Sequence, residues 1–462
     1  MAQLFFDHAL LDHGWADNVL IEIDAAGWIT GLVADAHIEE PVFHGAIEEP
    51  VFHGAIAVPG MPNLHSHAFQ RAMAGSTETP GPDGDSFWTW RQAMYGFVER
   101  LNPSDLVAVA AQLYVEMLES GFTSVAEFHY LHHDPAGRPY DDIGAMSAAI
   151  AEAAAISGIG ITFLPVFYAN GGFGGAAPGE GQRRFANTPG RYARLLDRVR
   201  DIAAGLPDAA VGVAPHSLRA VTPECLMEII GLGADGPVHI HVAEQIAEVE
   251  DCIAWSGQRP VQWLLANAAV DRRWCLIHAT HMTPDERHGL ALSGAVAGIC
   301  PITEANLGDG VFDGVAFQAE GGSYGVGTDA NVYIGVAAEL RQLEYSQRLR
   351  DGKRNLLAGK GVSTGRGLYD HALAGGAQAA GRRIGRLATG YRGDVVALDA
   401  DHVALFGRSR DQWLDGWLFA GDNSVVQDVW VGGQRVVANG VHHARQAAGQ
   451  AYRRTLAALL NP

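Results

Sequence analysis

The chain has 462 residues, of which 48% are hydrophobic and 18% charged, and it carries a formal net charge of −20 at pH 7. This composition is typical of a globular protein and excludes a disordered, collagen-like or coiled-coil chain; we expect no membrane-spanning segment and no signal peptide. The acidic charge argues against nucleic acid and anionic membranes as partners, and four cysteines without a CxxC pair predict a reduced, cytoplasmic protein.

The first 58 residues are predicted to form a small β unit, because VLIEIDAAGWITGLV alternates apolar and polar residues around an Ala-Gly turn. Within this unit the nine residues IEEPVFHGA at Ile38–Ala46 are repeated at once at Ile47–Ala55. Two such short copies cannot build a solenoid. We expect the duplication to be absorbed as a surface loop, so His44 and His53 are not expected to be ligands.

Residues 59–386 contain short apolar runs that end in polar residues and alternate with helical stretches. One such helix, PSDLVAVAAQLYVEMLESG, is expected to open at Ser104 before Asp105 and to close at Gly121. Eight strand–helix units predict an α/β fold, a (β/α)8 TIM barrel whose active site lies at the carboxyl ends of the strands. The eight runs are AVPGMPNLHSH, FTSVAEFHYLHH, GITFLPVFYANGG, AVGVAPHSLR, PVHIHVAEQ, WCLIHATH, AVAGICPIT and GSYGVGTDANV.

The segment that follows the barrel, residues 387–440, returns to the period-two alternation of β-strands with glycine turns. Neither chain end alone is long enough for a stable sandwich. We therefore predict that residues 1–58 and 387–440 form one composite β-sandwich domain around the inserted barrel. Residues 441–462 are predicted to be a C-terminal amphipathic helix.

The first barrel strand ends in Leu64-His65-Ser66-His67. Alternate side chains of a strand share a face, so His65 and His67 both point into the barrel mouth and can bind one metal ion. An HxH pair alone is equally compatible with surface or core histidines. Its place at the end of the first barrel strand favours the metal site.

Three later strands add further groups at the same end of the barrel. The fifth brings His241, with Glu244 three residues on, the sixth brings His278 and the eighth brings Asp329. Since unpartnered buried His and Asp are costly, we interpret the set as a metal and catalytic site. His239 is expected to be packed in the core or to support the ligands from behind.

The ordered motifs PGMPNLHSH, HVAE, a histidine on the sixth strand and GTD, with β-strands at both chain ends, resemble the amidohydrolase superfamily over essentially the whole chain. The resemblance implies one set of ligands for a divalent metal, usually zinc: His65, His67, His241 and Asp329. It implies a catalytic set of Glu244, His278 and Asp329. Binuclear members usually bridge two metals with a carboxylated lysine on a middle strand, and no lysine precedes Lys353. One metal per chain is therefore expected. We also expect the protein to form a homodimer.

The glutamate three residues after His241 resembles the deaminase branch of the superfamily, in which that residue carries protons between water and the leaving nitrogen. The expected reaction is hydrolytic release of ammonia from an sp² carbon. A metal lowers the pKa of bound water to roughly 7, Asp329 can accept the water proton, and His278 can hydrogen-bond the attacking oxygen or polarise the substrate.

Four further segments resemble the members that act on N-formimidoyl-L-glutamate in histidine degradation: HSHAFQRAMAG, SFWTWRQAMYGFVERL, AEFHYLHH and APHSLRAV. Such a dicarboxylate needs cationic and hydroxyl donors, and Arg offers two-pronged carboxylate binding. The candidate substrate-binding residues are Gln70, Arg91, Tyr130, His216 and Arg219. Arg91 alone could equally be a solvated surface residue, but its neighbours Trp88 and Trp90 favour an ordered loop.

Two alternatives stay open at this point. Another deaminase of the same branch, acting on guanine, cytosine or a modified adenosine, would need apolar walls and amide donors in place of several arginines. A metal-free scaffold on a decayed barrel would lack metal ligands, and the sequence has all of them.

Overall fold

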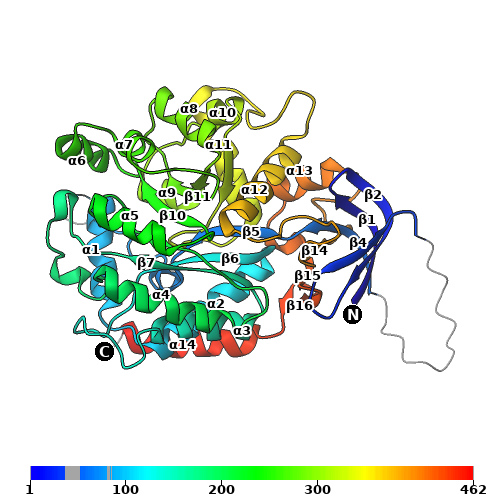
Figure 1. Ribbon diagram of the computed structural model, residues 1–462. Coiled ribbons are helices and arrows are strands. Elements are labelled where there is room, and N and C mark those ends of the chain that lie inside the picture. Colours follow the sequence, from blue (N-terminus) through cyan, green and yellow to red (C-terminus); the bar gives the residue numbers. More distant parts are fainter. Residues whose placement is uncertain (1, 37–51, 81–83, 85, 461–462) are drawn as a thin grey trace.

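The computed structural model describes residues 2–36, 52–80, 84 and 86–460 (Figure 1). One eight-stranded sheet contains strands from both chain ends, in the order β17-β16-β15-β14-β4-β1-β2-β3. The two ends meet where β14 pairs antiparallel with β4, with Val396 opposite Val58. The predicted β unit built from both chain ends is thus confirmed. Its strands are β1 (Ala2–Leu11), β2 (Gly14–Ile23), β3 (Ile29–Val33), β4 (Phe52–Pro59), β14 (Val395–Leu398), β15 (Val426–Val431), β16 (Gln434–Ala438) and β17 (Val441–His442).

The tandem copy lies largely outside the described residues, which include neither the first copy nor the start of the second. The end of the second copy is part of β4, which runs parallel to β1 with Phe52 opposite Leu4. The predicted surface loop is therefore wrong for Phe52–Ala55. The reason is that these residues continue directly into the apolar strand segment Ile56–Pro59.

The predicted barrel is confirmed, and its neighbouring strands run parallel. The short strands β8 and β9 share the fourth position, and bridges Val213–Val238, Ser217–His241 and Ser66–Asp329 close the ring. The barrel strands are β5 (Met61–Ser66), β6 (Phe122–His129), β7 (Gly160–Phe167), β8 (Ala210–Val211), β9 (Ala214–Pro215), β10 (Val238–Val242), β11 (Trp274–His278), β12 (Val296–Ile299) and β13 (Ser323–Val326).

Helices surround these strands, and α14 at the C-terminal end packs against α2 (Figure 1). The α-helices are α1 (Phe87–Val98), α2 (Pro103–Glu119), α3 (Ala145–Ser157), α4 (Pro189–Ala203), α5 (Pro223–Leu232), α6 (Ile246–Ser256), α7 (Pro260–Asn267), α8 (Pro284–Ser293), α9 (Pro301–Leu307), α10 (Gly314–Ala319), α11 (Val336–Asp351), α12 (Thr364–Ala380), α13 (Asp411–Ala420) and α14 (Arg445–Leu460). The 3-10 turns are η1 (Ala68–Met73), η2 (Phe173–Gly175), η3 (Glu180–Gln182) and η4 (Asn423–Val425). None of the helices in the described ranges is both long and apolar enough to cross a membrane.

Local sequence explains where several helices begin. In α4, α5 and α8 a threonine side chain caps the helix and a proline fills its first position, which needs no N–H donor. Helix α2 begins after Asn102, whose side chain accepts the N–H of Asp105 at 3.1 Å while Asp105 accepts that of Asn102. The predicted start at Ser104 is therefore wrong, because the reciprocal capping box forms two residues earlier.

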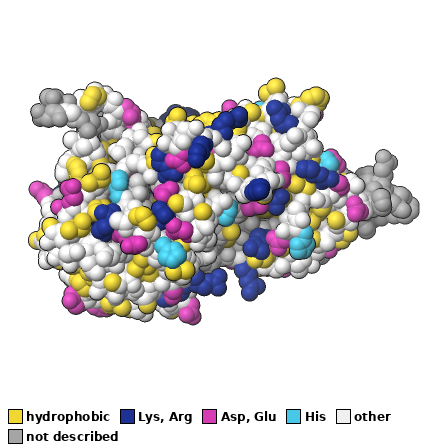
Figure 2. Space-filling view, turned by 90° about the horizontal axis from the view of Figure 1, so that it is seen from above, with side chains coloured by type: hydrophobic (Ala, Val, Ile, Leu, Met, Phe, Trp, Pro, Cys, Tyr) yellow, Lys and Arg dark blue, Asp and Glu magenta, His cyan; other side chains and the backbone are white. Residues whose placement is uncertain are grey.

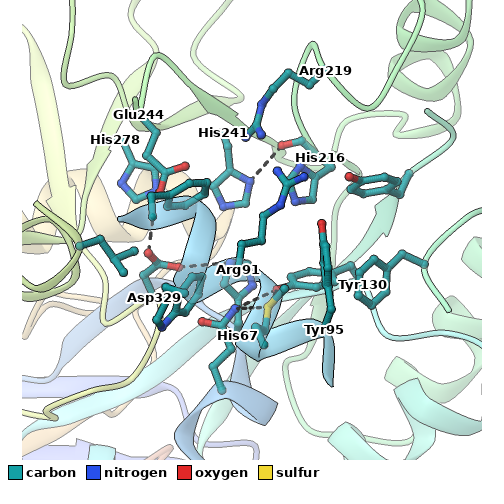
Figure 3. A pocket seen from close by; sticks show the side chains of 17 residues that line it. His67, Arg91, Tyr95, Tyr130, His216, Arg219, His241, Glu244, His278 and Asp329 are labelled. Atoms are coloured by element: carbon teal, nitrogen blue, oxygen red, sulfur yellow. Dashed lines mark hydrogen bonds and ion pairs between the residues drawn. The ribbon is translucent and has the colours of Figure 1, made fainter. Parts of the chain in front are cut away.

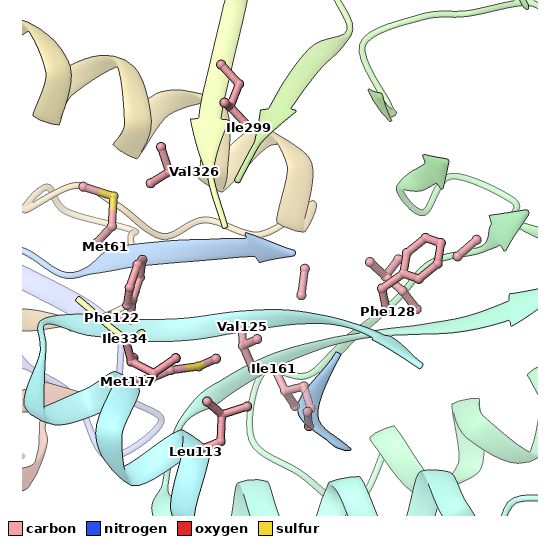
Figure 4. Packing of buried hydrophobic residues seen from close by; sticks show 14 of the residues in the cluster. Met61, Leu113, Met117, Phe122, Val125, Phe128, Ile161, Ile299, Val326 and Ile334 are labelled. Carbon is pink, nitrogen blue, oxygen red and sulfur yellow. The ribbon is translucent and has the colours of Figure 1, made fainter. Parts of the chain in front are cut away.

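The hydrophobic core extends from the barrel strands to the surrounding helices. Phe122 and Val125 of β6 are buried in the same cluster as Leu113 and Met117 of α2 (Figure 4). Gly60 alone separates β4 from β5, and a side chain there would overlap Thr123. On the outer face shown in Figure 2, Lys and Arg are interspersed with Asp and Glu.

Candidate active site

The four predicted metal ligands come together at the carboxyl ends of their strands. His65 is the second-last residue of β5 and His67 follows that strand directly, while His241 lies on β10 and Asp329 follows β13. One ligand atom from each lies within 4.8 Å of the other three, and all four residues are at most 5% exposed. Asp329 Oδ1 lies 3.1 Å from His67 Nε2 and 3.4 Å from His65 Nε2, and His65 Nε2 lies 3.1 Å from His241 Nε2.

Hydrogen bonds orient two of these rings. His67 Nδ1 donates to the Phe128 carbonyl at 2.8 Å, and His241 Nδ1 donates to the His216 carbonyl at 3.0 Å. Burial lowers the pKa of His241 well below its ordinary value and that of His65 to about 3, so both rings are neutral. Because the Nδ1 proton of His241 is used in its hydrogen bond, His241 Nε2 presents a lone pair towards His65 Nε2, an arrangement that a cation would stabilise.

The carboxylate completes a donor set that suits a divalent metal. Burial opposes ionisation of Asp329, but hydrogen bonds from His65 and His67 outweigh it and hold the pKa of Asp329 well below the usual range. Tetrahedral zinc with bonds of about 2.0–2.1 Å would place its donors roughly 3.3–3.4 Å apart, close to the distances above. The residues present thus fit a divalent cation.

His278 lies beside this cluster among three carboxylates. Its Nε2 is 3.5 Å from Glu244 Oε1 and 3.8 Å from Asp329 Oδ2, while its Nδ1 is 3.2 Å from Glu304 Oε1. Burial alone would lower the pKa of His278, but the attraction of Glu244 and the other carboxylates raises it well above the ordinary value. Burial also raises the pKa of Glu244, and His278 opposes this shift. Sequence reasoning missed Glu304, which is buried on α9.

Several site loops have unusual backbone conformations. Ala243, His278, Ala279, Asp329 and Asn331 all have φ between +45° and +68°, a region that residues other than glycine rarely occupy. Asn331 holds part of this backbone, since its Nδ2 donates to the carbonyls of His67 at 3.0 Å and Asp329 at 2.9 Å. Such strained conformations are found mainly where the surrounding structure imposes them, as at active sites.

A cavity that is open to solvent leads to the metal-ligand cluster (Figure 3). All five predicted substrate-binding residues line it: Gln70, Arg91, Tyr130, His216 and Arg219. Gln70 Nε2 donates to the Tyr130 hydroxyl at 2.8 Å, and Tyr95 and Tyr168, which sequence reasoning did not single out, also line the wall. His239 lies apart from the cavity and donates through Nε2 to the Ala379 carbonyl at 2.8 Å.

The two arginines of the cavity converge on one aromatic ring. The Cζ atoms of Arg91 and Arg219 lie 5.0 and 5.7 Å from the ring centre of Trp88. Within the described part of the chain, neither guanidinium has a hydrogen-bond or ion-pair partner, and the Nε atoms of both are buried. Two cations without carboxylate partners make this wall suitable for an anionic ligand.

Known proteins are similar in sequence to this chain over most or all of its length. The profile of the amidohydrolase family matches residues 56–436. The chain is 50% identical to formimidoylglutamate deiminase of Pseudomonas aeruginosa, covering 100% of both chains, and 28% identical to 8-oxoguanine deaminase of that organism, covering 87% of each.

Solved structures show the same relationship. An amidohydrolase from Brucella melitensis superimposes with a TM-score of 0.93 and 51% identity, covering 100% of both chains. An adenosine deaminase from Xanthomonas campestris, solved with bound zinc, has a TM-score of 0.79 at 20% identity, covering 100% of this chain and 99% of that one. At this low identity the comparison supports the fold alone. The resemblance found in the sequence motifs is thus confirmed, and the chain belongs to the amidohydrolase family.

Proposed function

We propose that the protein hydrolyses N-formimidoyl-L-glutamate to N-formyl-L-glutamate and ammonia. The observation that carries the proposal is the pair of unpartnered guanidiniums, Arg91 and Arg219, in the cavity that leads to the metal-ligand cluster. A substrate with two carboxylates complements these cations, whereas a neutral nucleobase leaves them unpaired. The 50% identity to a formimidoylglutamate deiminase over the full chain supports the same substrate.

The metal site is proposed to hold one zinc ion, bound by His65, His67, His241 and Asp329. The mixed nitrogen and oxygen donors suit zinc, and the spacing of the donor atoms supports this choice. When bound, such a cation makes hydroxide available near neutral pH by lowering the pKa of water to roughly 7.

Side chains of the protein would then accept and donate the protons of the reaction. Asp329 Oδ2 accepts a proton from the attacking water, and His278 hydrogen-bonds the attacking oxygen. Glu244 carries protons to the formimidoyl nitrogen, a role suited to a carboxyl group whose pKa burial has raised. Water oxygen bonds to the formimidoyl carbon, the bond from that carbon to the terminal nitrogen breaks, and ammonia leaves with both water protons.

The remaining lining residues are proposed to bind the substrate. Arg91 and Arg219 pair with its carboxylates, and Gln70, Tyr130 and His216 supply polar contacts nearer the ligand cluster. Burial lowers the pKa of His216 well below its ordinary value, and the nearby Arg219 adds to this effect. His216 is therefore a neutral donor or acceptor in this arrangement.

An assay of ammonia release tests the proposal. Zinc-loaded protein is given N-formimidoyl-L-glutamate, N-formimidoyl-L-aspartate, guanine, cytosine and adenosine in parallel. We expect the glutamate derivative to have the highest kcat/KM. A preference for any nucleobase would instead establish the alternative deaminase, and metal-free, inactive protein would establish the scaffold.

Two further properties complete the proposal. We place the enzyme in histidine degradation in the cytoplasm, which the four free cysteines Cys225, Cys252, Cys275 and Cys300 support. The homodimer stays a prediction, and light scattering of the purified protein tests it.

A further inference from the structure

A buried carboxyl group beside the candidate active site has no part in the chemistry proposed above. Asp309 follows α9 directly after Gly308 and is only 4% exposed. Its Oδ1 accepts a hydrogen bond from Gln245 Nε2. Its Oδ2 is buried and has no hydrogen-bond partner in the part of the chain that the structure describes.

The backbone of Asp309 joins two further segments of the site. Its N–H donates to the Glu304 carbonyl at 2.9 Å, and its carbonyl accepts a hydrogen bond from His281 Nε2 at 2.8 Å. Gln245 directly follows Glu244 after β10, and His281 lies three residues after His278 beyond β11. Asp309 thus connects helix α9 with the segments that follow Glu244 and His278.

The Asp309 carboxyl also lies close to those residues themselves. One ligand atom each of Asp309, Glu244 and His278 lies within 4.8 Å of the other two, and all three residues are buried. The ionisable groups that act on Asp309 are Glu244, His278, Glu304 and Asp329. Burial, reinforced by repulsion from Glu244, raises the pKa of Asp309 to about 9. A neutral carboxyl at neutral pH adds no negative charge against Glu244.

We propose that Asp309 is a positioning residue, which anchors the Gln245 side chain and thereby holds Glu244 in place against His278. It does not line the cavity and is not expected to touch the substrate. The inference rests on the proposed function, because Glu244 must reach both water and the leaving nitrogen. A displacement of about 1 Å in such a group can cost on the order of 10²-fold in rate.

A set of four variants tests this role: Asp309→Ala, Gln245→Ala, the double variant and Asp309→Asn. Each single alanine variant should lower kcat by about 10–100-fold and change KM by less than about 3-fold. The double variant should be no slower than the slower single one, because both changes break the same contact. Asn retains the oxygen that accepts from Gln245, so Asp309→Asn should keep kcat within about 3-fold of the parent.

Controls separate positioning from general damage. Asp251→Ala, at an exposed position on α6, should behave as the parent. Zinc content and thermal midpoint should be unchanged in Asp309→Asn and Gln245→Ala. If Asp309→Ala fails to fold, these two variants still test the inference. A crystal structure of Gln245→Ala should show Glu244 displaced from His278.

Several results would overturn the inference. These are multiplicative losses in the double variant, a loss confined to KM, a parental kcat in Gln245→Ala, or Glu244 unmoved in the crystal structure. Failure of the parent to release ammonia from N-formimidoyl-L-glutamate would count against the proposed function alone. The variants would then be compared on the substrate that the parent does hydrolyse, and the crystal structure needs no substrate.

Discussion

Glu304 and His278 form a buried pair in which the Glu304 Oε1 lies 3.2 Å from the His278 Nδ1. The other ring nitrogen, Nε2, faces Glu244 at 3.5 Å. Glu304 also accepts the Cys300 N–H at 2.9 Å, which fixes the carboxylate to the end of β12. The ring that is proposed to contact the attacking oxygen is therefore held by a carboxylate that sequence reasoning missed.

Replacing Glu304 with Gln should lower kcat by about 10–100-fold, because a charge-assisted hydrogen bond that orients His278 is lost. The Glu304 carboxylate helps to raise the pKa of His278, so its removal lets the imidazolium lose its proton at lower pH. The alkaline limb of the pH profile of kcat/KM should therefore move to lower pH. An unmoved limb with normal kcat would show that Glu304 does not act on His278.

Removing a proposed metal ligand should abolish metal binding and activity together. In His65→Ala or Asp329→Ala one of the four donors is lost, and no spare ligand is proposed among the described residues. Elemental analysis of the purified variants checks this, and the parent should contain about one zinc per chain. Two tightly bound metals in the parent would contradict the mononuclear site.

For Glu244→Gln we expect intact metal binding and fold but a fall in kcat on the order of 10²–10⁴. The amide cannot carry a proton between water and the leaving nitrogen, and Glu244 is not among the four clustered ligands. Steady-state kinetics with metal analysis on the same sample gives the answer. A variant that loses its zinc but has a normal rate after reconstitution would refute the proton-carrier role.

If Arg91 and Arg219 bind the substrate carboxylates, replacing either with Met should cost about 2–5 kcal/mol of transition-state stabilisation. The loss in kcat/KM should be much smaller for an analogue that lacks the corresponding carboxylate. Lys should restore little, because an ammonium group cannot reproduce the planar two-pronged contact. Equal losses with and without the carboxylate would mean that these arginines only support the Trp88 ring and its helix.

The tandem copy of nine residues should be dispensable. Deleting Ile47–Ala55 joins the identical first copy to Ile56, so the strand sequence Phe-His-Gly-Ala of β4 is retained in the same place. Thermal midpoint and turnover should change little. A large fall in the thermal midpoint on calorimetry would show that the extra nine residues contribute to the fold.

The barrel and the clustering of the metal ligands could be predicted from the sequence, because both follow from the repeated alternation of apolar strands and helices. His241 lies near the end of one buried run and Asp329 follows another, and closure of a parallel barrel brings all such strand ends to one side. Glu304 and Asp309 could not be found in this way. Glu304 lies in PITEANL, which has the pattern of an ordinary short helix, and its burial depends on where α9 sits across the barrel mouth. The end of the second tandem copy was mistaken for a loop because its partner β1 is remote in sequence.

The single residue between β4 and β5 links the outer sheet directly to the catalytic barrel. Strand β4 pairs with β1 and β14 in the outer sheet. After Gly60 the chain continues directly as β5 of the barrel, which carries His65. Only the second tandem copy can occupy β4 and still lead into β5, so this short connection selects between two identical segments. We therefore expect that release of the bound metal and unfolding of the outer sheet occur in one cooperative transition, which thermal unfolding followed at both sites would show.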